Sequence, residues 1–482
     1  MQRLNYLFLL TLLLAVGFVA CNDDEMEPGN TDCDVTAGPC PTLQVERTQD
    51  QSCADGTTTT VTLVDVTDLG EGTGTTRWTN DKVWVLNGLV FVNEGQTLTI
   101  EPGTIIKAKP GQIEEASALV VARGARLVAE GTAAEPIIFT SEADGIFNLP
   151  GGGTCTTTDL DANTRGLWGG VILLGNADIT SDTEERAIEG IPTSETRGLY
   201  GGSDDNDNSG SLRYVSIRHG GTDIGAGNEI NGLTMGGVGS GTTIENIEVF
   251  ANADDGFEWF GGTVNTKNLI SAYCGDDAFD YDEGWRGNNQ FWVAFQRGAG
   301  DRGGEHDGGP SSCETCMPFA IPVIYNATYV GQGESVGARL VSLRDNAGGK
   351  YYNSIFTDYG RGVDIEYLPG NDDSFKQAQD GNIEFRNNLF FNVATGNELF
   401  TVTGGDEVDI SAQEVELADI VADWNNTVAD PELEDLQPRS AAATSDLATP
   451  ADSFFENVTY KGAVAPDGTP WFADWSRLSE EL

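Results

Sequence analysis

The sequence predicts an all-β fold, a right-handed parallel β-helix with a C-terminal cap. Short runs rich in Val, Ile, Leu and Thr alternate with dense punctuation by 61 Gly and 17 Pro, a pattern typical of many short strands. One stretch repeats with a shift of 22 residues, from Ile247 to Leu269. Amphipathic helical patterns are scarce before about residue 410. The repeat favours a solenoid over a sandwich, because stacked coils bury equivalent side chains on each other.

The chain opens with an export signal. Residues 1–20 contain Arg3 and an apolar run over 6–20, which has the length of a signal-peptide core and is short for a membrane span. Cys21 directly follows Ala20. This resembles a lipobox, in which the cysteine thiol takes a diacylglycerol; the alternative is an ordinary signal peptide with a chance cysteine. We expect a signal peptide over 1–20 and lipidation at Cys21.

The next segment, residues 21–55, is expected to be an acidic tether and the start of the folded body. Residues 22–32 are polar and carry little apolar surface, so they cannot contribute to a core. An acidic tract after a lipidated cysteine resembles the export signal of surface-exposed lipoproteins, although it also fits a solvated spacer. We expect an outer-membrane lipoprotein that faces the cell exterior and contacts the membrane only through its anchor.

The charge balance excludes two classes of partner. The formal net charge is −50, with 26 basic against 76 acidic residues. Nucleic acids and anionic lipid headgroups are repelled by such a field. Bound divalent cations are compatible with it.

Eight cysteines are present, and their number suits an oxidising compartment. Cys313 and Cys316 are close enough in sequence to form a local disulfide. Four others can form two further pairs, with the pairing open: Cys33, Cys40, Cys53 and Cys155. Cys274 is then left over and is expected to be buried. A zinc site is excluded, because only one Cys-x-x-Cys motif exists.

The β-helix itself is expected over residues 56–400, built from strands of four to six residues. The clearest strand signals are Val83–Val92, Thr97–Ile100, Thr104–Lys107 and Ala118–Ala122. The 22-residue shift predicts an apolar column of Ile247, Leu269 and Phe291 on successive coils.

Several of these segments resemble a known group. Thr97–Thr104, Ala125–Ser141, Trp168–Val171 and Leu212–Gly221 are similar to coils of the pectin-lyase-like superfamily, in particular its mostly uncharacterised bacterial surface lipoproteins. The resemblance covers roughly residues 80–400 and implies the parallel β-helix fold. It specifies the activity poorly, because one fold of this kind has many functions.

Residues 401–482 are expected to hold a last coil, a loop and the cap. A short helix is expected over Ala412–Trp424. Residues 453–479 contain five Phe and Trp residues, too many to remain in solvent. We expect them to cover the open last coil, whose strand edges would otherwise pair with a neighbour.

The strongest candidate site is an acidic ladder produced by the repeat. It pairs Asp254 with Asp276, Asp255 with Asp277, and Glu258 with Asp280. Carboxylates on adjacent coils, about 4.8 Å apart, repel by about 3 kcal/mol at an effective dielectric near 20. A bound Ca²⁺ would remove that repulsion. The alternative is that these are solvated turn residues, for which Asp is common.

A catalytic interpretation uses part of the same ladder. Asn252-Ala-Asp254, Asp276-Asp277 and Gly304-Glu305-His306 are similar to the polygalacturonase pattern, although the third spacing is longer and the glycines flanking His306 are replaced. The resemblance implies Asp277 as general acid and Asp254 and Asp276 as residues that activate water, with His306 completing the candidate catalytic set.

Aromatic residues beside the ladder suggest a sugar-binding surface. Trp259, Tyr281, Trp285 and Arg286 are the candidate substrate-binding residues. Core packing is the competing explanation for the aromatic members.

Three functions remain open from the sequence. The first is a surface lipoprotein that binds extracellular polysaccharide on one face, with bound Ca²⁺. The second is a polysaccharide hydrolase or lyase that uses the Asp ladder. The third is a structural or adhesive rod. The sequence does not decide whether the protein is an enzyme.

Overall fold

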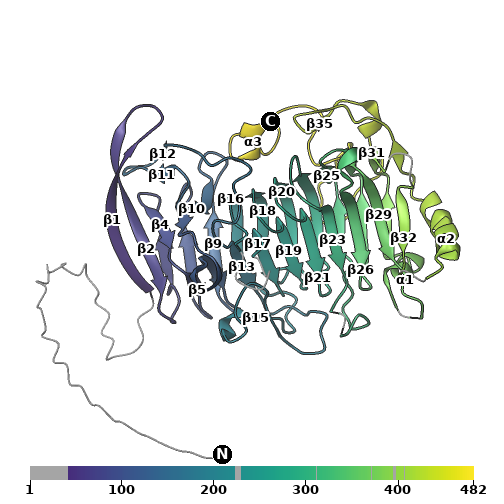
Figure 1. Cartoon of the computed structure of the whole chain (residues 1–482), viewed down its shortest axis with the longest axis horizontal. Helices are drawn as coiled ribbons and strands as arrows, with labels where there is room; N and C mark the ends of the chain where they lie inside the picture. Colours follow the sequence, from purple (N-terminus) through teal and green to yellow (C-terminus); the bar gives the residue numbers. More distant parts are fainter. Residues whose placement is uncertain (1–41, 223–229, 311, 371, 395–397, 406–407) are drawn as a thin grey trace, which may run out of the picture.

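The computed structural model describes residues 42–222, 230–310, 312–370, 372–394, 398–405 and 408–482. The signal peptide, Cys21, Cys33 and Cys40 therefore lie outside the described residues. Within them, two long sheets wind into one elongated solenoid (Figure 1). Neighbouring strands along the solenoid pair in parallel from β2 onwards. The chain is an all-β, right-handed parallel β-helix, as predicted.

The described part of the first sheet has 19 strands. They are β1 (Thr42–Ser52), β2 (Thr58–Asp68), β3 (Thr76–Trp78), β4 (Val83–Leu86), β6 (Thr97–Ile100), β7 (Ile105–Ala108), β9 (Arg126–Glu130), β10 (Ile137–Ser141), β16 (Gly210–Arg218), β18 (Thr243–Phe250), β20 (Asn265–Ala272), β22 (Asn288–Phe295), β24 (Val323–Tyr325), β25 (Thr328–Val330), β27 (Gly349–Tyr352), β28 (Ile355–Tyr359), β30 (Ile383–Arg386), β31 (Leu389–Val393) and β33 (Thr427–Val428).

The second sheet has ten strands among the described residues. They are β5 (Leu89–Val92), β8 (Ala118–Val121), β13 (Val171–Leu174), β17 (Leu233–Gly236), β19 (Phe257–Phe260), β21 (Phe279–Asp282), β23 (Arg302–Asp307), β26 (Arg339–Arg344), β29 (Arg361–Glu366) and β32 (Phe400–Thr403).

Small elements decorate the coils. The paired short strands are β11 (Ile146–Asn148) with β12 (Thr154–Thr156), β14 (Arg186–Ala187) with β15 (Leu199–Tyr200), and β34 (Leu433–Glu434) with β35 (Gln437–Pro438). The helices are α1 (Ser374–Gln379), α2 (Ser411–Ala422) and α3 (Leu478–Glu481), with 3₁₀ turns at Ile113–Glu115, Thr196–Gly198, Glu334–Val336 and Ala441–Ala443. No helix among the described residues is long and apolar enough to cross a membrane.

Asparagine makes a recurring bend in the coils. Five asparagines have positive φ angles between 53° and 58°, a conformation that asparagine tolerates better than most residues: Asn246, Asn268, Asn326, Asn353 and Asn387. Their side chains also bond between coils: Asn268 Nδ2 donates to Asn246 Oδ1 at 3.0 Å, and Asn387 Nδ2 donates to Asn353 Oδ1 at 2.8 Å. The bend turns each coil without breaking its hydrogen bonds to the next coil.

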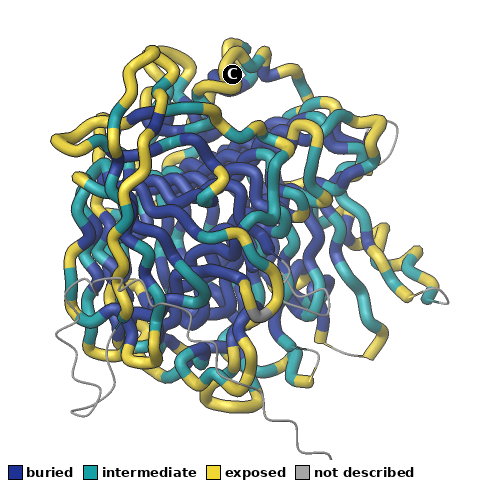
Figure 2. Tube along the Cα trace, turned by 60° about the vertical axis from the view of Figure 1, so that its left-hand side comes forward, coloured by how far each residue is buried: buried dark blue, intermediate teal, exposed yellow. Residues whose placement is uncertain are grey.

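The interior is filled by aliphatic and aromatic side chains stacked along the solenoid, and exposed residues lie mainly at the turns and ends (Figure 2). The ring centroid of Trp259 lies 4.4 Å from that of Trp285 and 5.2 Å from that of Trp292, and both of these rings are nearly parallel to the Trp259 ring. All three tryptophans are 0% exposed. Stacked rings of this kind hold successive coils together.

One predicted core column changes at its third member. Ile247 pairs with Leu269, as predicted, but Leu269 pairs with Trp292 rather than Phe291. Phe291 takes the left-handed bend position, with φ of 63°, and packs in a separate cluster with residues of the C-terminal segment. The prediction of Phe291 was wrong because this coil has one additional residue.

The end of the solenoid is covered by α2 and the residues after it. Leu417 and Trp424 belong to the main core, and the Trp424 ring packs edge-on against Phe400 of β32 at 5.1 Å. Figure 1 shows α2 beside β32 at that end. The expected helix over 412–424 corresponds to α2 to within two residues.

Residues 429–482, here called the C-terminal strap, run back along the outside of the first sheet (Figure 1). Phe472 and Trp475 pack against residues of the first sheet such as Ile270. The backbone amides of Arg477 and Leu478 donate to the buried Glu248 carboxylate at 2.9 and 2.8 Å. The expected position of the aromatic residues over the last coil was wrong, because the first sheet leaves an apolar outer face that the strap covers.

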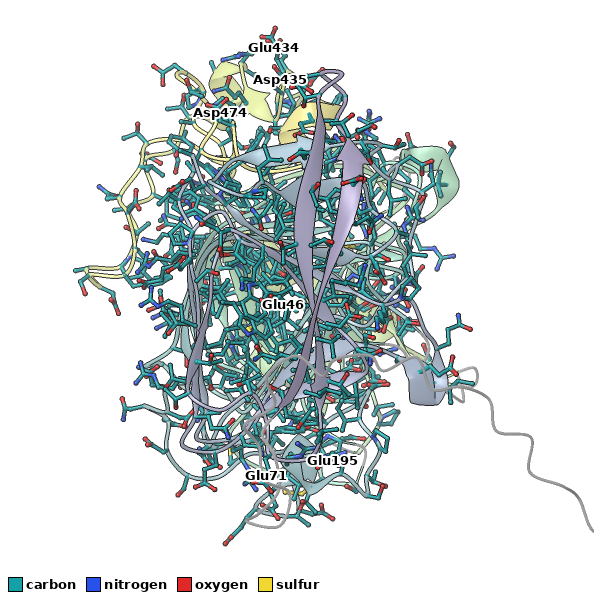
Figure 3. The ribbon with its side chains drawn as sticks, turned by 90° about the vertical axis from the view of Figure 1, so that its left-hand side faces the viewer. Glu46, Glu71, Glu195, Glu434, Asp435 and Asp474 are labelled. Carbon is teal, nitrogen blue, oxygen red and sulfur yellow. A yellow bond between two sulfur atoms is a disulfide. The ribbon has the colours of Figure 1, made fainter. Side chains whose placement is uncertain are left out.

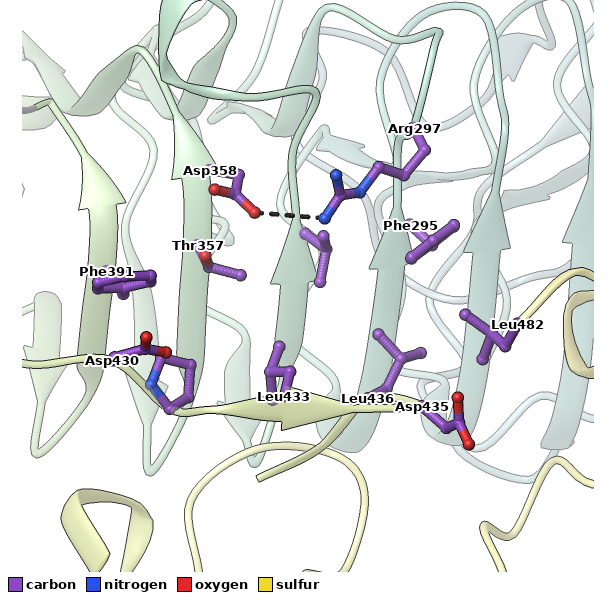
Figure 4. Close-up of a pocket in the computed structure, with 12 residues that line it drawn as sticks. Phe295, Arg297, Thr357, Asp358, Phe391, Asp430, Leu433, Asp435, Leu436 and Leu482 are labelled. Carbon is purple, nitrogen blue, oxygen red and sulfur yellow. Dashed lines mark hydrogen bonds and ion pairs between the residues drawn. The ribbon is translucent and has the colours of Figure 1, made fainter. Parts of the chain in front are cut away.

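A hollow remains under the strap. It has a volume of 390 Å³ and lies between Phe295, Thr357 and Phe391 of the first sheet region and Leu433 and Leu436 of the strap. Figure 4 shows these side chains facing one another, with the Arg297–Asp358 ion pair above them at 3.5 Å. The hollow contains none of the site residues predicted from the sequence.

Acidic side chains are spread over the surface rather than gathered in one place. Figure 3 labels Glu434 and Glu71 at opposite ends of one view and Glu46 between them, and all three are exposed. Solvated charges of this kind interact weakly with one another. Buried carboxylates are therefore the informative ones, and three of them, Asp255, Glu258 and Asp277, lie on or just before β19 and β21 of the second sheet.

Candidate functional site

The outer face of the second sheet is apolar in its first strands. Phe91, Val120 and Ile172 lie in register on β5, β8 and β13 and form a cluster outside the main core. The segment 175–209 covers them, in part through Tyr200. Tyr200 Oη also donates to Glu283 Oε2 at 2.6 Å, which ties the segment to the solenoid. This half of the face is closed to solvent.

From β19 onwards the same outer face becomes polar. Glu258, Asp280 and Glu305 are in register on β19, β21 and β23, and Ser342 and Asp364 continue the row on β26 and β29. Alternate residues of these strands point into the core, so this row faces outward. The predicted pairing of Glu258 with Asp280 is thus present on neighbouring strands.

The ladder residues form overlapping carboxylate clusters. Within each cluster, the oxygens lie within 4.8 Å of one another. The three clusters are Asp255, Glu258 and Asp280; Asp254, Asp255 and Asp276; and Asp276, Asp277 and Asp301. Clusters with only oxygen donors suit Ca²⁺ and Mg²⁺ better than softer metals.

The first cluster is the most deeply placed. Asp255 and Glu258 are each 7% exposed. Asp255 Oδ1 accepts a hydrogen bond from the Asp277 amide at 2.8 Å, and Glu258 accepts one from Asn231 Nδ2. Asp280 Oδ1 is buried and has no hydrogen-bond partner in the part of the chain that the structure describes. A buried carboxylate oxygen without a donor needs a proton or a cation.

The pKa shifts of these carboxyl groups also indicate that the cluster needs protons or a cation. Burial raises the pKa of Asp255, Glu258 and Asp280 well above their usual values, and neighbouring carboxylates raise each further. Burial also raises the pKa of Asp277, partly opposed by Arg302, whose Nη1 lies 3.2 Å from Asp277 Oδ2. Ionisation of the cluster of Asp255, Glu258 and Asp280 is therefore costly unless a cation is bound there.

Comparison with known proteins identifies the family. A family model described as a pectate-lyase like beta helix domain matches residues 70–430. The chain belongs to this family. Searches of curated proteins and of solved structures gave no match.

The pectate-lyase-like β-helix places His306 inside its core. His306 is 0% exposed, and its ring stacks on Tyr281 at 3.9 Å between centroids. Nε2 lies 2.7 Å from Tyr351 Oη, and burial lowers the pKa of His306 to about 3. His306 faces away from the carboxylates on the outer face, so the expected catalytic set of Asp254, Asp276, Asp277 and His306 is not brought together.

The predicted aromatic surface is also absent. Trp259, Tyr281 and Trp285 are each 0% exposed and belong to the main core. Tyr281 Oη donates to Gly348 O at 2.6 Å, and Trp285 Nε1 donates to Val264 O at 3.2 Å. Their assignment as substrate-binding residues does not fit the structure, because their side chains alternate with the outward-facing carboxylates.

Arg286 has a bridging position in this pectate-lyase-like β-helix. Its Nη2 lies 2.6 Å from Asp205 Oδ1, and its Nη1 donates to Asp178 O at 3.2 Å. Both partners belong to the segment 175–209. Arg286 thus connects that segment to the solenoid, and its donors are occupied by protein.

The structure also aligns arginines that the sequence did not bring together. Arg302, Arg339 and Arg361 are in register on β23, β26 and β29, on the outer face that also carries Glu305. The loop 308–322, between β23 and β24, lengthens the coil that joins β23 to β26. No constant spacing in the sequence therefore reveals the row. The only signal in the sequence was that arginines are rare in a strongly acidic chain.

The cysteines occupy two disulfides among the described residues. Cys313 pairs with Cys316 within the loop 308–322, and Cys53 pairs with Cys155 across 102 residues. Cys274 is free and buried.

Proposed function

We propose that this protein binds an extracellular glycan on the polar outer face of the second sheet, formed by β19, β21, β23, β26 and β29. The family description, pectate-lyase like, supports a carbohydrate-related function. The observation that carries the proposal is the row of in-register polar side chains on five neighbouring strands, beside a first half of the face that is closed by the segment 175–209. A linear polymer can lie along such a row and contact successive coils.

We further propose that a divalent cation occupies the cluster of Asp255, Glu258 and Asp280, and that it is Ca²⁺. The unpartnered Asp280 Oδ1 and the raised carboxyl pKa values support a cation there. Ca²⁺ prefers six to eight oxygen ligands, so three carboxylates leave positions for water or for sugar oxygens. The cation would thus link the protein to its ligand and neutralise the cluster.

The binding function is favoured over hydrolysis by the position of His306. A hydrolase or lyase that used His306 together with the ladder would require both on one face, and His306 lies in the core. The carboxylates retain chemistry of their own, since a raised pKa suits a general acid.

The test is affinity electrophoresis through gels that contain single polysaccharides, both neutral and acidic, with Ca²⁺ or with chelator. We expect at least one polysaccharide to slow the native protein, and more so with Ca²⁺. Glu258→Gln with Asp280→Asn should weaken that binding roughly tenfold, because charge-assisted contacts are lost. The matched control is Glu434→Gln with Asp435→Asn, which removes the same charge from the strap. Failure of every polysaccharide to bind would leave the structural rod as the better explanation.

We also propose that the protein is anchored by lipid at Cys21 on the outer face of the outer membrane. The signal core, the cysteine after Ala20 and the acidic tract that follows support this. Cys21→Ser should block maturation or release the protein from the membrane fraction, because no lipid can be attached. Detergent phase partitioning of cells that express each form measures this. A Cys21→Ser protein that partitions like the native one would refute the anchor, and protease treatment of intact cells tests which side it faces.

A further inference from the structure

The first sheet ends in an open strand edge at the N-terminal end of the solenoid (Figures 1 and 3). This edge strand, β1, pairs with β2 along its whole length in one antiparallel register, from Thr42 opposite Asp68 to Ser52 opposite Thr58. Among the described residues, β2 is the only strand in register with it. Alternate N–H and C=O groups of β1 therefore point away from the sheet, where they can pair with a further strand.

The two ends of the solenoid are treated differently by the fold. At the C-terminal end, α2 covers the last coil, and Leu417 and Trp424 are part of the main core there. At the N-terminal end, Gln51 is the only buried residue of β1, and the rest of the strand is exposed or half-buried. The edge at β1 is thus a long one that the described part of the chain leaves uncovered.

The usual protection of an open edge is missing from β1. Proteins blunt such edges with proline, a bulge, a very short strand or free charges. β1 has 11 residues, no proline and no bulge. Its three charged side chains are all held by the same molecule: Glu46 by Lys82 at 3.0 Å, Arg47 by Asp65 at 3.1 Å, and Asp50 by Thr60 at 2.7 Å. The strand therefore lacks what normally keeps the edges of two molecules apart.

We propose that β1 pairs in antiparallel fashion with β1 of a second copy of this chain, about a two-fold axis at Val45. Val45 and Leu43 lie on the same face of the strand and are 49% and 38% exposed, which is unusual on an otherwise polar strand. In this register Val45 of one copy faces Val45 of the other, and Leu43 lies diagonally beside it. Pairing joins the four side chains into one apolar patch.

Charge selects this register over its neighbours. Two-fold symmetry requires that one residue of the strand faces its own copy. An axis at Glu46 or at Arg47 would place like charges opposite each other, which destabilises a strand pair. An axis at Thr48 would place Glu46 opposite Asp50. With the axis at Val45, the paired residues are 42–48, and no charged residue faces one of the same sign.

The same segment suits a second copy better than other occupants. Residues 42–48 contain one Glu and one Arg, so the paired strands are neutral within a chain of net charge −50. The preceding residues of the same chain are a poorer match, because they include Pro39 and Pro41, which have no amide to donate to a strand. Seven paired residues bury less than the roughly 800 Å² per partner of a typical stable interface, so we expect a reversible dimer.

The test is site-specific disulfide cross-linking of the full chain in membranes, with mild oxidation and non-reducing electrophoresis. Facing residues of antiparallel strands have Cα atoms about 4.5–5.5 Å apart, which a disulfide can bridge. Val45→Cys should therefore give a cross-linked dimer in high yield. Gln49→Cys lies on the same face of the same strand, but its two copies would be about 27 Å apart, and we expect no dimer from it.

A second variant tests the contact without relying on the new cysteine alone. Leu43→Lys added to Val45→Cys should lower the cross-linked fraction several-fold, because a lysine then faces Arg47 of the second copy. Val415→Lys is the matched control, since Val415 is 67% exposed on α2 at the other end of the solenoid, and it should leave the cross-linking unchanged. Circular dichroism checks that every variant is folded, and the native chain shows what its own cysteines contribute.

Equal cross-linking at positions 45 and 49 would mean random collision and would overturn the dimer. A higher yield at position 49 would overturn the proposed register. Absence of cross-linking at both positions would mean that β1 is unpaired or is covered by another segment or partner, which also overturns the proposal. Glycan binding is measured independently of these outcomes.

Discussion

Replacing Trp259 by alanine is expected to lower the free energy of unfolding by about 3–5 kcal/mol. The indole is 0% exposed and stacks between Trp285, Trp292 and Phe257, with centroids at 4.4, 5.2 and 6.0 Å. Alanine would leave a cavity that the rigid stacked coils cannot close. The midpoint of denaturant unfolding measures the effect.

Two controls separate this core role from a sugar-binding role. Trp259→Phe keeps most of the stacked surface and should cost less stability than alanine. Folded Trp259→Ala protein, at a temperature well below its melting point, should bind polysaccharide like the native chain. Unchanged stability together with lost binding would mean that Trp259 lies on a sugar-binding surface after all.

The second large effect concerns pH and cation. Without divalent cation, the melting temperature is expected to fall as the pH rises from about 4 towards 7. Burial raises the pKa of Asp255, Glu258 and Asp280 and raises that of Asp282 to about 7. The folded state therefore binds more protons than the unfolded state in this window, and its stability decreases as those protons leave.

Ca²⁺ should reverse that loss, and most strongly near neutral pH, where the carboxylates are ionised. A cation that binds only the folded state adds about 2.7 kcal/mol at a hundredfold excess over its Kd. Glu258→Gln with Asp280→Asn should abolish the Ca²⁺ effect and raise the melting temperature of the cation-free protein at pH 7. The substitution of Asp276 and Asp277 by asparagine tests the neighbouring clusters separately.

Monovalent salt also screens charge, so the melts are compared at equal ionic strength. The strap variant Glu434→Gln with Asp435→Asn removes two exposed carboxylates and should leave the Ca²⁺ response unchanged. If NaCl at matched ionic strength raises the melting temperature as much as Ca²⁺ does, the cluster binds no specific cation. The ladder carboxylates then repel one another and are only screened by salt.

The sequence alone determined much of the architecture. The strand at Thr97–Ile100 begins and ends where predicted, and the run Val83–Val92 contains β4 and β5, separated at Asn87-Gly88. The 22-residue shift places Phe257 on Phe279 and Glu258 on Asp280. These predictions succeeded because a solenoid makes contacts between residues one coil apart, so a local repeat specifies the three-dimensional register.

The tertiary structure decided what the repeat could not. Alternation along β21 and β23 places Tyr281 and His306 on one face and Asp280 and Glu305 on the other. Only the packing shows that His306, a polar and titratable side chain, belongs to the buried face and not to the face that carries the carboxylates. The alignment of Arg302 with Arg339 depends on the loop 308–322 leaving the coil and returning to it. Because this inserted loop breaks the constant period, residues that are in register on either side of it are neighbours in space, although the sequence gives no sign of it.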